Sequence, residues 1–333
     1  MENVGQTSNR GVELSLTGYI IDRPDFTLNA TFNIGRNKNK IDKLASGEKE
    51  MVLSSGWAGS QLLNSDDYRA YVGGTTGLIY GFVNDGFYTV DDFKPFDSKS
   101  RTWTLKDGVV NSSPLSGDPR PGNAKFKKLT PVDENSANPY TLTDDDRTVI
   151  GNTTPKFSGG FGLNATFKGF DVSAFFNFMY DFDVFNANKV MMTTWASNNY
   201  NNFSMDISAA KRWRNFDDMG NEIRYSPEIL AEFNKNATMW NPTSIGRPIA
   251  MSYAVEDGSF LRLNTATIGY TLPRVWTNKV GLSRVRFYAS GYNLFTITGY
   301  SGYDPEVDIA TGLTPNIDNN RYPRSRTYTF GVQ

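Results

Sequence analysis

Apolar and polar residues alternate strictly in several runs of this chain. Between residues 26 and 35, the even positions hold Phe, Leu, Ala, Phe and Ile, and the odd positions hold Thr, Asn, Thr, Asn and Gly. Two similar runs, 157–167 and 170–182, are separated only by Lys168-Gly169. Period-two alternation predicts β-strands with one apolar and one polar face, and glycine in a two-residue connection predicts a β-hairpin.

Further runs complete the set of predicted strands. Residues 12–20 alternate in the same way and lead into the first run through a turn at Asp22–Asp25. Three less regular runs follow later in the chain: 260–272, 283–298 and 324–333. The alternation changes phase near Asn264-Thr265, as a β-bulge would cause. The sequence predicts about seven strands, and nine if residues 72–88 and 123–130 pair with the same sheet.

The predicted strands are long. Strands of soluble proteins usually have about 5–6 residues, whereas strands that cross a membrane need about 9–11 and end in aromatic residues. The second face carries Ser, Thr, Asn and Gly, which is typical of a wall that borders water. We therefore predict an all-β fold, an antiparallel transmembrane β-barrel segment. The side chains expected to face the lumen are Thr27, Asn29, Asn33, Asn164, Thr166 and Asn177.

Short and long connections alternate along the chain. The short ones are residues 22–25, 168–169 and 273–282, and the long polar ones are 42–155, 184–258 and 299–323. In an up-and-down barrel this order puts every short turn at one rim and every long loop at the other, as in outer-membrane proteins. The predicted location is the cell outer membrane, with the long loops outside.

The composition excludes several kinds of chemistry. The 333 residues contain no Cys and no His, which excludes thiol catalysis, disulfides, zinc held by Cys or His, and every mechanism that needs an imidazole. The carboxylates Asp181 and Asp183, or Asp144 to Asp146, come from single segments, whereas a retaining glycosidase needs two carboxyl groups from different elements. We predict that the chain is not an enzyme and has no cofactor.

Charge and hydropathy restrict the partners and the location. The 34 Lys and Arg nearly balance the 35 Asp and Glu, so no basic excess indicates a nucleic acid. The mean hydropathy is −0.46, which a barrel tolerates because only every second residue of its strands meets lipid. Residues 1–5 show no signal peptide. The chain is therefore expected to be either cytoplasmic or a piece of a longer protein.

Nine segments form an ordered set of motifs from one end of the chain to the other. They are NVGQTSNRGVEL (Asn3–Leu14), FNIGRNKNKI (Phe32–Ile41), YGFVNDGFY (Tyr80–Tyr88), DDRTVIGNTTPKF (Asp145–Phe157), KGFDVSAFF (Lys168–Phe176), VEDGSFLRL (Val255–Leu263), GYTLP (Gly269–Pro273), NLFTITGYSGYDPEV (Asn293–Val307) and YPRSRTYTFGV (Tyr322–Val332). Each motif alone is a weak signal. The ordered set resembles the C-terminal part of the SusC/RagA-type TonB-dependent outer-membrane transporters of Bacteroidetes.

This resemblance implies a large barrel, 22-stranded in the family, with an N-terminal plug domain inside it. It also implies import of glycans, oligosaccharides or peptides across the outer membrane. The implied partners are a SusD-like surface lipoprotein that caps the barrel, TonB, which pulls on the plug, and the surrounding outer-membrane lipid.

The chain departs from the pattern of the whole family. The plug, the TonB box and most of the barrel strands are missing from the sequence, and the last strand stops at Gln333, a little before the family's terminal aromatic residue. Seven strands cannot enclose a lumen that holds plug and cargo. We therefore interpret residues 1–333 as a partial barrel domain and expect transport to belong to the parent protein.

Aromatic residues in the predicted long loops are candidates for contact with cargo or with the lid. Flat rings beside Asn and Asp side chains can hold sugars and peptides by stacking and hydrogen bonding. The alternative is that these rings pack the loops together or against the lid. The candidates are Tyr80, Phe82, Tyr88, Trp195, Tyr200, Trp213, Trp240, Tyr300 and Tyr303.

An acidic stretch lies where relatives carry a calcium loop. Asp133, Asn135 and Asp144 offer the hard oxygen ligands that Ca²⁺ prefers. The sharp turn of such a loop wants a central glycine, and here Ala137-Asn138-Pro139 occupies that place. A solvated loop without metal is therefore the favoured interpretation.

Strand arginines and a turn-rich segment are expected to have structural roles. Arg262, Arg284 and Arg286 are expected to pair with acids such as Glu256 and Asp257. The segment Tyr300–Val307 is a family signature by resemblance, and its role in rim folding or in lid contact stays open. The alternative for the whole chain is a soluble or surface β-rich carbohydrate-binding or structural module, which would fold without detergent.

Overall fold

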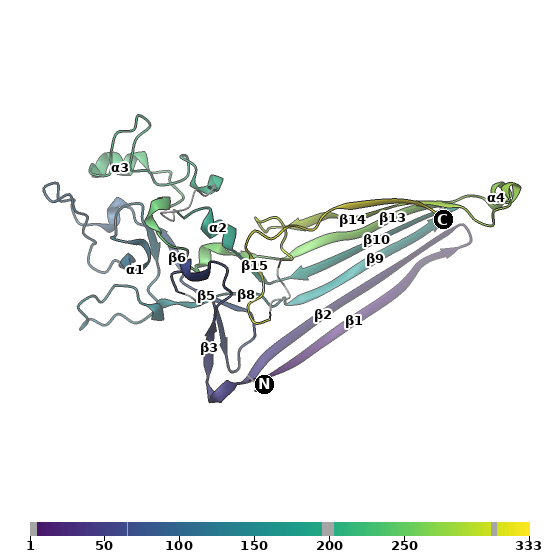
Figure 1. Ribbon diagram of the computed structural model, residues 1–333, viewed down its shortest axis with the longest axis horizontal. Coiled ribbons are helices and arrows are strands. Elements are labelled where there is room, and N and C mark those ends of the chain that lie inside the picture. The colour runs from purple at the N-terminus through teal and green to yellow at the C-terminus, as the bar shows by residue number, and fades with distance from the viewer. Residues whose placement is uncertain (1–4, 65, 195–202, 308–311) are drawn as a thin grey trace.

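The computed structural model describes residues 5–64, 66–194, 203–307 and 312–333. They form a long sheet and, at one end of it, a separate mass of shorter elements (Figure 1). We call this second part the loop body; it is built from the described residues of 45–156, 182–258 and 299–323. The short connections between strands lie at the opposite end of the sheet.

Seven strands form the long sheet, in the order β1-β2-β9-β10-β13-β14-β16, with every neighbouring pair antiparallel. Their bounds are β1 Gly5–Arg23, β2 Phe26–Leu44, β9 Phe157–Phe167, β10 Phe170–Tyr180, β13 Phe260–Thr271, β14 Arg286–Thr298 and β16 Thr327–Val332. The sheet is open, with β1 and β16 at its edges. This agrees with the predicted antiparallel barrel segment.

The loop body contains short strands and helices. The strands are β3 Glu50–Leu53, β4 Tyr68–Tyr71, β5 Leu78–Gly81, β6 Asn84–Phe87, β7 Ala124–Phe126, β8 Thr148–Asn152, β11 Asp183–Asn186, β12 Val255–Asp257 and β15 Ile317–Asp318. The helices are α1 Ser113–Ser116, α2 Ala187–Met191 and α3 Pro227–Phe233, while α4 Arg274–Thr277 lies at the turn end of the long sheet (Figure 1). In the described part of the chain, no helix is long and apolar enough to cross a membrane.

The predicted hairpin at Lys168-Gly169 is confirmed. β9 and β10 pair from Phe167 with Phe170 onwards, so only two residues connect them. Lys168 has φ of 43° and Gly169 has φ of 90°. Two positive φ values are what a twisted two-residue hairpin requires, and glycine adopts such a value without steric cost.

The predicted phase change in β13 is also confirmed. In the pairing of β13 with β10, Leu263 lies opposite Phe176 and Thr265 opposite Phe175, so Asn264 is the extra residue of a bulge. A second bulge interrupts the predicted alternation at Ile20. Tyr19 pairs with Asn29 and Ile21 with Leu28, so Ile20 is the extra residue and Ile21 takes the place beside Leu28.

The segments proposed as eighth and ninth strands do not join the long sheet. Residues 78–81 (β5) belong to the four-stranded sheet β3-β4-β5-β8, and residues 84–87 (β6) pair with β7. These strands have only three or four residues each. They help to fold the loop body, and the long sheet has seven strands.

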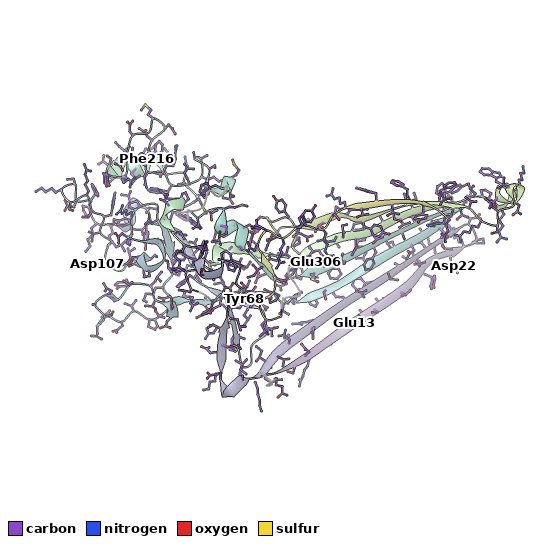
Figure 2. The ribbon with its side chains drawn as sticks, in the orientation of Figure 1. Glu13, Asp22, Tyr68, Asp107, Phe216 and Glu306 are labelled. Carbon is purple, nitrogen blue, oxygen red and sulfur yellow. The ribbon has the colours of Figure 1, made fainter. Side chains whose placement is uncertain are left out.

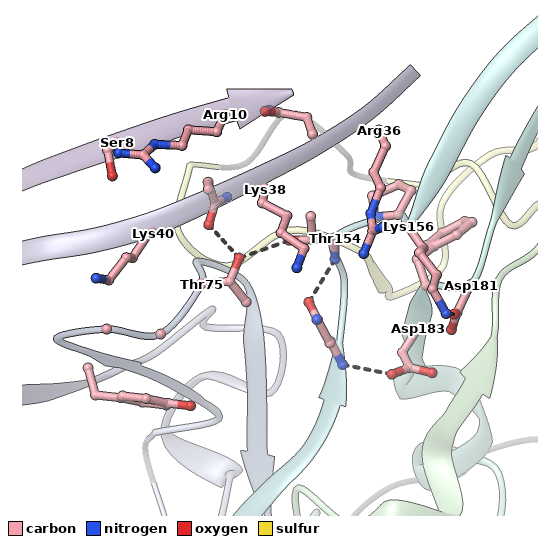
Figure 3. Close-up of a pocket in the computed structure, with 18 of the residues that line it drawn as sticks. Ser8, Arg10, Arg36, Lys38, Lys40, Thr75, Thr154, Lys156, Asp181 and Asp183 are labelled. Atoms are coloured by element: carbon pink, nitrogen blue, oxygen red, sulfur yellow. Dashed lines mark hydrogen bonds and ion pairs between the residues drawn. The ribbon is translucent and has the colours of Figure 1, made fainter. Parts of the chain in front are cut away.

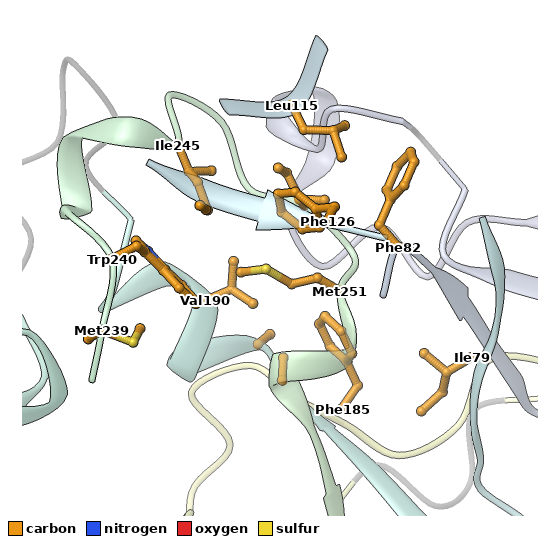
Figure 4. Close-up of a cluster of buried hydrophobic side chains, with 14 of the residues drawn as sticks. Ile79, Phe82, Leu115, Phe126, Phe185, Val190, Met239, Trp240, Ile245 and Met251 are labelled. Carbon is orange, nitrogen blue, oxygen red and sulfur yellow. The ribbon is translucent and has the colours of Figure 1, made fainter. Parts of the chain in front are cut away.

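A hydrophobic core holds the loop body together (Figure 4). Phe82 and Phe126 come from the first long connection, Phe185 and Met251 from the second, and Ile317 from the third; each is at most 4% exposed. Burying a large apolar side chain contributes roughly 1.5–3 kcal/mol. The three long connections therefore fold as one unit on a shared core.

Candidate functional site

One face of the long sheet is polar and is cross-linked by side-chain hydrogen bonds. The Oγ1 atoms of Thr27 and Thr166 lie 2.6 Å apart, and Asn164 Nδ2 donates to Asn29 Oδ1 at 3.0 Å. Asn33 lies on the same face, opposite Gly160. We call this surface the polar face. Paired residues of neighbouring strands point to the same face, and Asn177 pairs with Gly160 as Asn33 does. All six residues predicted to face the lumen therefore lie on the polar face.

The opposite face, which we call the apolar face, exposes large hydrophobic side chains. On it, Phe161 stacks on Phe176 with ring centroids 4.6 Å apart. Many side chains of this face are 41–80% exposed: Leu14, Leu16, Leu163, Phe167, Phe170, Val172, Ile268, Phe287, Phe295, Ile297, Tyr328, Phe330 and Val332. A soluble monomer rarely exposes a continuous apolar surface of this kind. The surface therefore argues against the soluble-module alternative.

A buried ion-pair network joins the polar face to the loop body. Arg262 of β13 is 3% exposed, and its Nη2 lies 2.5 Å from Asp304 Oδ1 and its Nε 3.5 Å from Glu306 Oε2. Arg324 contacts Glu306 from the solvent side at 2.8 Å. Figure 2 shows Glu306 at the junction of the sheet and the loop body. Burial by itself would raise the pKa of Asp304, but the hydrogen bond from Arg262 holds that pKa below its ordinary value.

These contacts correct the predicted partners of the strand arginines. Arg262 pairs with Asp304, and Arg286 pairs with Asp171, whereas Glu256 binds Lys189 at 3.3 Å. Sequence reasoning expected Glu256 and Asp257 because they are near Arg262 in the chain. The true partner is 42 residues away and reaches Arg262 only through the folding of the last long connection.

The turn-rich segment Tyr300–Val307 closes the rim. Tyr300 is 5% exposed, and its hydroxyl donates to Asp318 Oδ2 at 2.7 Å. The N–H of Ser301 donates to Glu256 Oε2 at 2.9 Å. Together with Asp304, these contacts attach the segment to the sheet and to the loop body, which supports a role of Tyr300, Ser301 and Asp304 in rim folding.

Most of the predicted aromatic contact residues are interior residues. Six of them are at most 8% exposed: Tyr80, Phe82, Tyr88, Trp213, Trp240 and Tyr300. In this conformation they are buried, as the alternative interpretation held. Tyr303 is 85% exposed and remains a candidate. Trp195 and Tyr200 lie outside the described residues.

The acidic stretch does not assemble a cation site in the described residues. Asp133 accepts the N–H of Asn135 at 3.0 Å within its own turn, and Asp144 accepts from Asn64 Nδ2 at 3.0 Å. No group of three or more acidic side chains in the described part of the chain could hold a metal ion. The three residues thus form local polar contacts.

Sequence reasoning missed the importance of Asp146. Its buried carboxylate accepts the N–H of Leu129 (2.9 Å), the N–H and Oγ1 of Thr130 (2.8 and 2.7 Å) and the N–H of Thr143 (2.8 Å), and Lys128 Nζ lies 3.3 Å away. Thr143 and Asp146 form a capping box. Their three-residue spacing is a local sequence pattern from which this role of Asp146 could have been predicted. Burial would raise the pKa of Asp146, but these hydrogen bonds outweigh it and lower the pKa to about 2.

We expect Asp146→Asn to loosen the loop around residues 129–146. The folded pKa lies below the ordinary value of 3.8, so the ionised carboxylate stabilises the fold above that pH, and this stabilisation is lost as the pH falls through about 2. The shift corresponds to about 2 kcal/mol. Amide hydrogen exchange of Leu129 and Thr130 should become at least tenfold faster at pH 7, and the difference from the wild type should shrink at pH 3.

The exposed neighbour Asp145 provides the control for this prediction. Asp145→Asn removes the same charge without touching the buried hydrogen bonds, so exchange of Leu129 and Thr130 should stay within about twofold of the wild type. Equal effects of the two substitutions would show that Asp146 acts only through net charge.

The long two-faced strands, with short turns at one end and folded loops at the other, define a class: the segment is part of the wall of an antiparallel β-barrel. No family model matches the sequence.

Two relatives match the sequence along nearly its whole length. The TonB-dependent receptor P3 of Formosa agariphila is 30% identical over 338 residues, which covers 100% of this chain and 29% of that protein. The TonB-dependent receptor SusC of Bacteroides thetaiotaomicron is 24% identical, covering 99% of this chain and 26% of SusC. Over its whole length the chain is similar to a C-terminal portion of TonB-dependent receptors, SusC among them.

Solved structures show the same fold. The RagAB peptide importer in its "open-open" state matches with a TM-score of 0.65 at 23% identity, over 99% of this chain and 29% of that one. Its "closed-closed" state matches with a TM-score of 0.63. The chain thus spans less than a third of the length of the relatives it matches.

Proposed function

We propose that the chain forms part of the wall and the external loops of an outer-membrane, TonB-dependent nutrient importer. In this proposal the importer takes up glycans, oligosaccharides or peptides together with a SusD-like surface lipoprotein, and TonB acts through the remainder of the receptor. The chain performs no chemistry on the cargo. Its own contribution is a polar wall along the transport path and a loop body that shapes the entrance.

The observation that carries the proposal is the division of the long sheet into a polar and an apolar face. The ten consecutive pairs between β2 and β9, from Phe26 to Gly35, match the length of a membrane-crossing strand. A bilayer would cover the apolar face, and the polar face would border the lumen. The lumen-facing assignment of Thr27, Asn29, Asn33, Asn164, Thr166 and Asn177 follows from this arrangement.

The class of cargo is suggested by the relatives and by exposed loop residues. RagAB is a peptide transporter, and its fold is shared by this chain. Tyr303 offers an exposed ring next to the buried Asp304, so the segment that carries it is held in place by the ion-pair network. We propose Tyr303 as a contact for cargo or for the lipoprotein lid.

The membrane arrangement can be tested with single cysteines, because the chain has none of its own. In the full receptor, any native cysteines outside this chain are replaced first. In isolated outer membranes, a water-soluble maleimide should label Asn29→Cys at least about tenfold faster than its neighbour Leu28→Cys, since lipid covers only the apolar face. On intact cells, the reagent should label Met219→Cys in the loop body but not Trp276→Cys at the turn end, although both side chains are exposed.

Denatured samples provide the control, since all four cysteines should then react equally. Equal labelling of Asn29→Cys and Leu28→Cys in membranes would contradict the assignment of the faces. Import is tested in the same strain: deletion of the receptor gene should abolish growth on the glycan or oligopeptide that it takes up, and re-expression should restore growth. Unchanged growth on every member of a broad nutrient panel would contradict the importer proposal.

A further inference from the structure

The β1–β2 hairpin extends beyond the rest of the long sheet at the loop end (Figure 1). β2 pairs with β9 only from Phe26 to Gly35, whereas its pairing with β1 continues to Leu44. The hairpin therefore continues the apolar face past the level at which β9 begins.

The side chains of the apolar face change from apolar to cationic along this extension. Beyond Ile34, every second residue of β2 is basic: Arg36, Lys38 and Lys40. Arg10 of β1 lies directly opposite Lys38 and therefore points to the same face. The Arg36 guanidinium lies 5.7 Å from the centroid of the Phe157 ring, the aromatic residue at the start of β9. We call Arg10, Arg36, Lys38 and Lys40 the cationic cluster.

The cationic cluster lines a cavity of about 780 Å³ between the hairpin and the chain segments at 152–156 and 181–183 (Figure 3). Two of the carboxylates in the cavity have partners of their own. Asp181 binds Lys156 at 3.0 Å, and Asp183 accepts the N–H of Asn152 at 2.7 Å. Asp42 is the third carboxylate of the lining.

Three members of the cluster are free to bind an anion. Arg10, Lys38 and Lys40 are exposed, and none of them forms an ion pair with a described residue. The described lining holds five basic and three acidic side chains, so its net formal charge is positive. Guanidinium and ammonium groups at this spacing favour phosphate oxygens.

The position of the cluster along the strand indicates where the anion would be. A strand rises about 3.4 Å per residue, and a tilt of about 45° reduces the advance along the membrane normal to about 2.4 Å. Arg36 then lies about 5 Å and Lys38 about 10 Å beyond Ile34, the last apolar side chain of the strand. The headgroup layer of a bilayer is about 5–8 Å thick on each side of the hydrocarbon, so Arg36 lies within it. Lys38 and Arg10 start just beyond this layer, and their long side chains can reach back to the level of the lipid phosphates.

Building on the proposed membrane location, we propose that the cationic cluster is a binding site for the phosphate groups of anionic lipid headgroups in the leaflet on the loop side. The four basic side chains lie on the apolar face, although Asn37 and Asn39 of the same lining lie on the polar face. Binding of phosphate groups there would fix the position of the hairpin, and of the loop body attached to it, along the membrane normal.

The test uses the full receptor, purified in a neutral detergent after a check that it is present in the outer-membrane fraction. Native mass spectrometry measures binding of dioleoylphosphatidylglycerol and, in parallel, of neutral dioleoylphosphatidylcholine. A basic residue near an anionic surface contributes roughly fivefold to binding. The triple variant Arg10→Gln, Lys38→Gln, Lys40→Gln should therefore weaken phosphatidylglycerol binding about hundredfold and leave phosphatidylcholine binding unchanged.

A matched control removes three exposed lysines of the loop body that lie outside the cavity: Lys99→Gln, Lys106→Gln, Lys127→Gln. This variant should stay within about twofold of the wild type. Equal losses in both variants, or none in the first, would overturn the lipid site. Displacement of the lipid by millimolar inorganic phosphate would also overturn it and would show a site for free phosphate.

The outcomes separate this inference from the proposed function. A receptor that assembles in the outer membrane but binds phosphatidylglycerol equally well with and without the cluster overturns only the lipid site. A wild-type receptor that is missing from the outer-membrane fraction overturns the proposed function and, with it, the lipid site.

Discussion

Arg262→Ala is expected to detach the rim segment from the long sheet. The substitution leaves the buried carboxylate of Asp304 without its main partner and removes one of the two arginines near Glu306, and breaking a buried ion pair in this way costs about 3–5 kcal/mol. Amide exchange across the described residues of 299–307 should accelerate by two to three orders of magnitude. Hydrogen-exchange mass spectrometry of the full receptor measures this directly.

Arg324→Ala is the matched control, because Arg324 contacts the same Glu306 but is 41% exposed. Water screens the arginine end of this pair, so its loss costs less than loss of the buried Arg262–Asp304 pair, and exchange should accelerate at least tenfold less than in Arg262→Ala. If Arg324→Ala loosened the segment as much as Arg262→Ala, the network would depend on the total charge around Glu306 and not on the buried pair.

Phe161→Arg is expected to prevent assembly of the receptor in the membrane. Phe161 lies near the middle of β9 on the apolar face, where a lipid-facing arginine costs about 2–4 kcal/mol. The change also removes the stacking on Phe176, worth about 0.5–1.5 kcal/mol. The variant should lose the heat-modifiable, detergent-resistant form on gels and should be degraded before it reaches the outer membrane.

Asn164→Arg on the same strand tests the opposite face. Its side chain lies on the polar face, where the charge would remain hydrated, and the substitution sacrifices only the hydrogen bond to Asn29, about 0.5–1.5 kcal/mol. The folded form should therefore persist. Equal tolerance of Arg at both positions would contradict the assignment of the apolar face to lipid.

The long sheet could be predicted from the sequence because its signals are local. Alternation between Phe26 and Gly35, the Lys168-Gly169 turn and the phase change at Asn264 each depend on residues close together in the chain, and the structure confirms all three. The bulge at Ile20 was not predicted, because a bulge can follow a regular run without any change in the pattern that precedes it.

The loop body could not be predicted in the same way. Its contacts join residues that are far apart in sequence, such as Arg262 with Asp304 and Tyr300 with Asp318, and no local pattern specifies them. The aromatic residues illustrate the difficulty: a ring that packs a core and a ring that holds a ligand have the same chemistry. Only burial separates Tyr88, which is fully buried, from Tyr303, which is 85% exposed.

The shared core of the loop body has a consequence for how receptors of this family diverge. Phe82, Phe185 and Ile317 come from three different connections and pack in one cluster, so the shape of each connection depends on the other two. A single connection grafted from a relative would meet foreign partners in a close-packed interior and would lose stability. We therefore expect a functional exchange between receptors to need either surface changes that leave the core intact or a transfer of all three connections as one module.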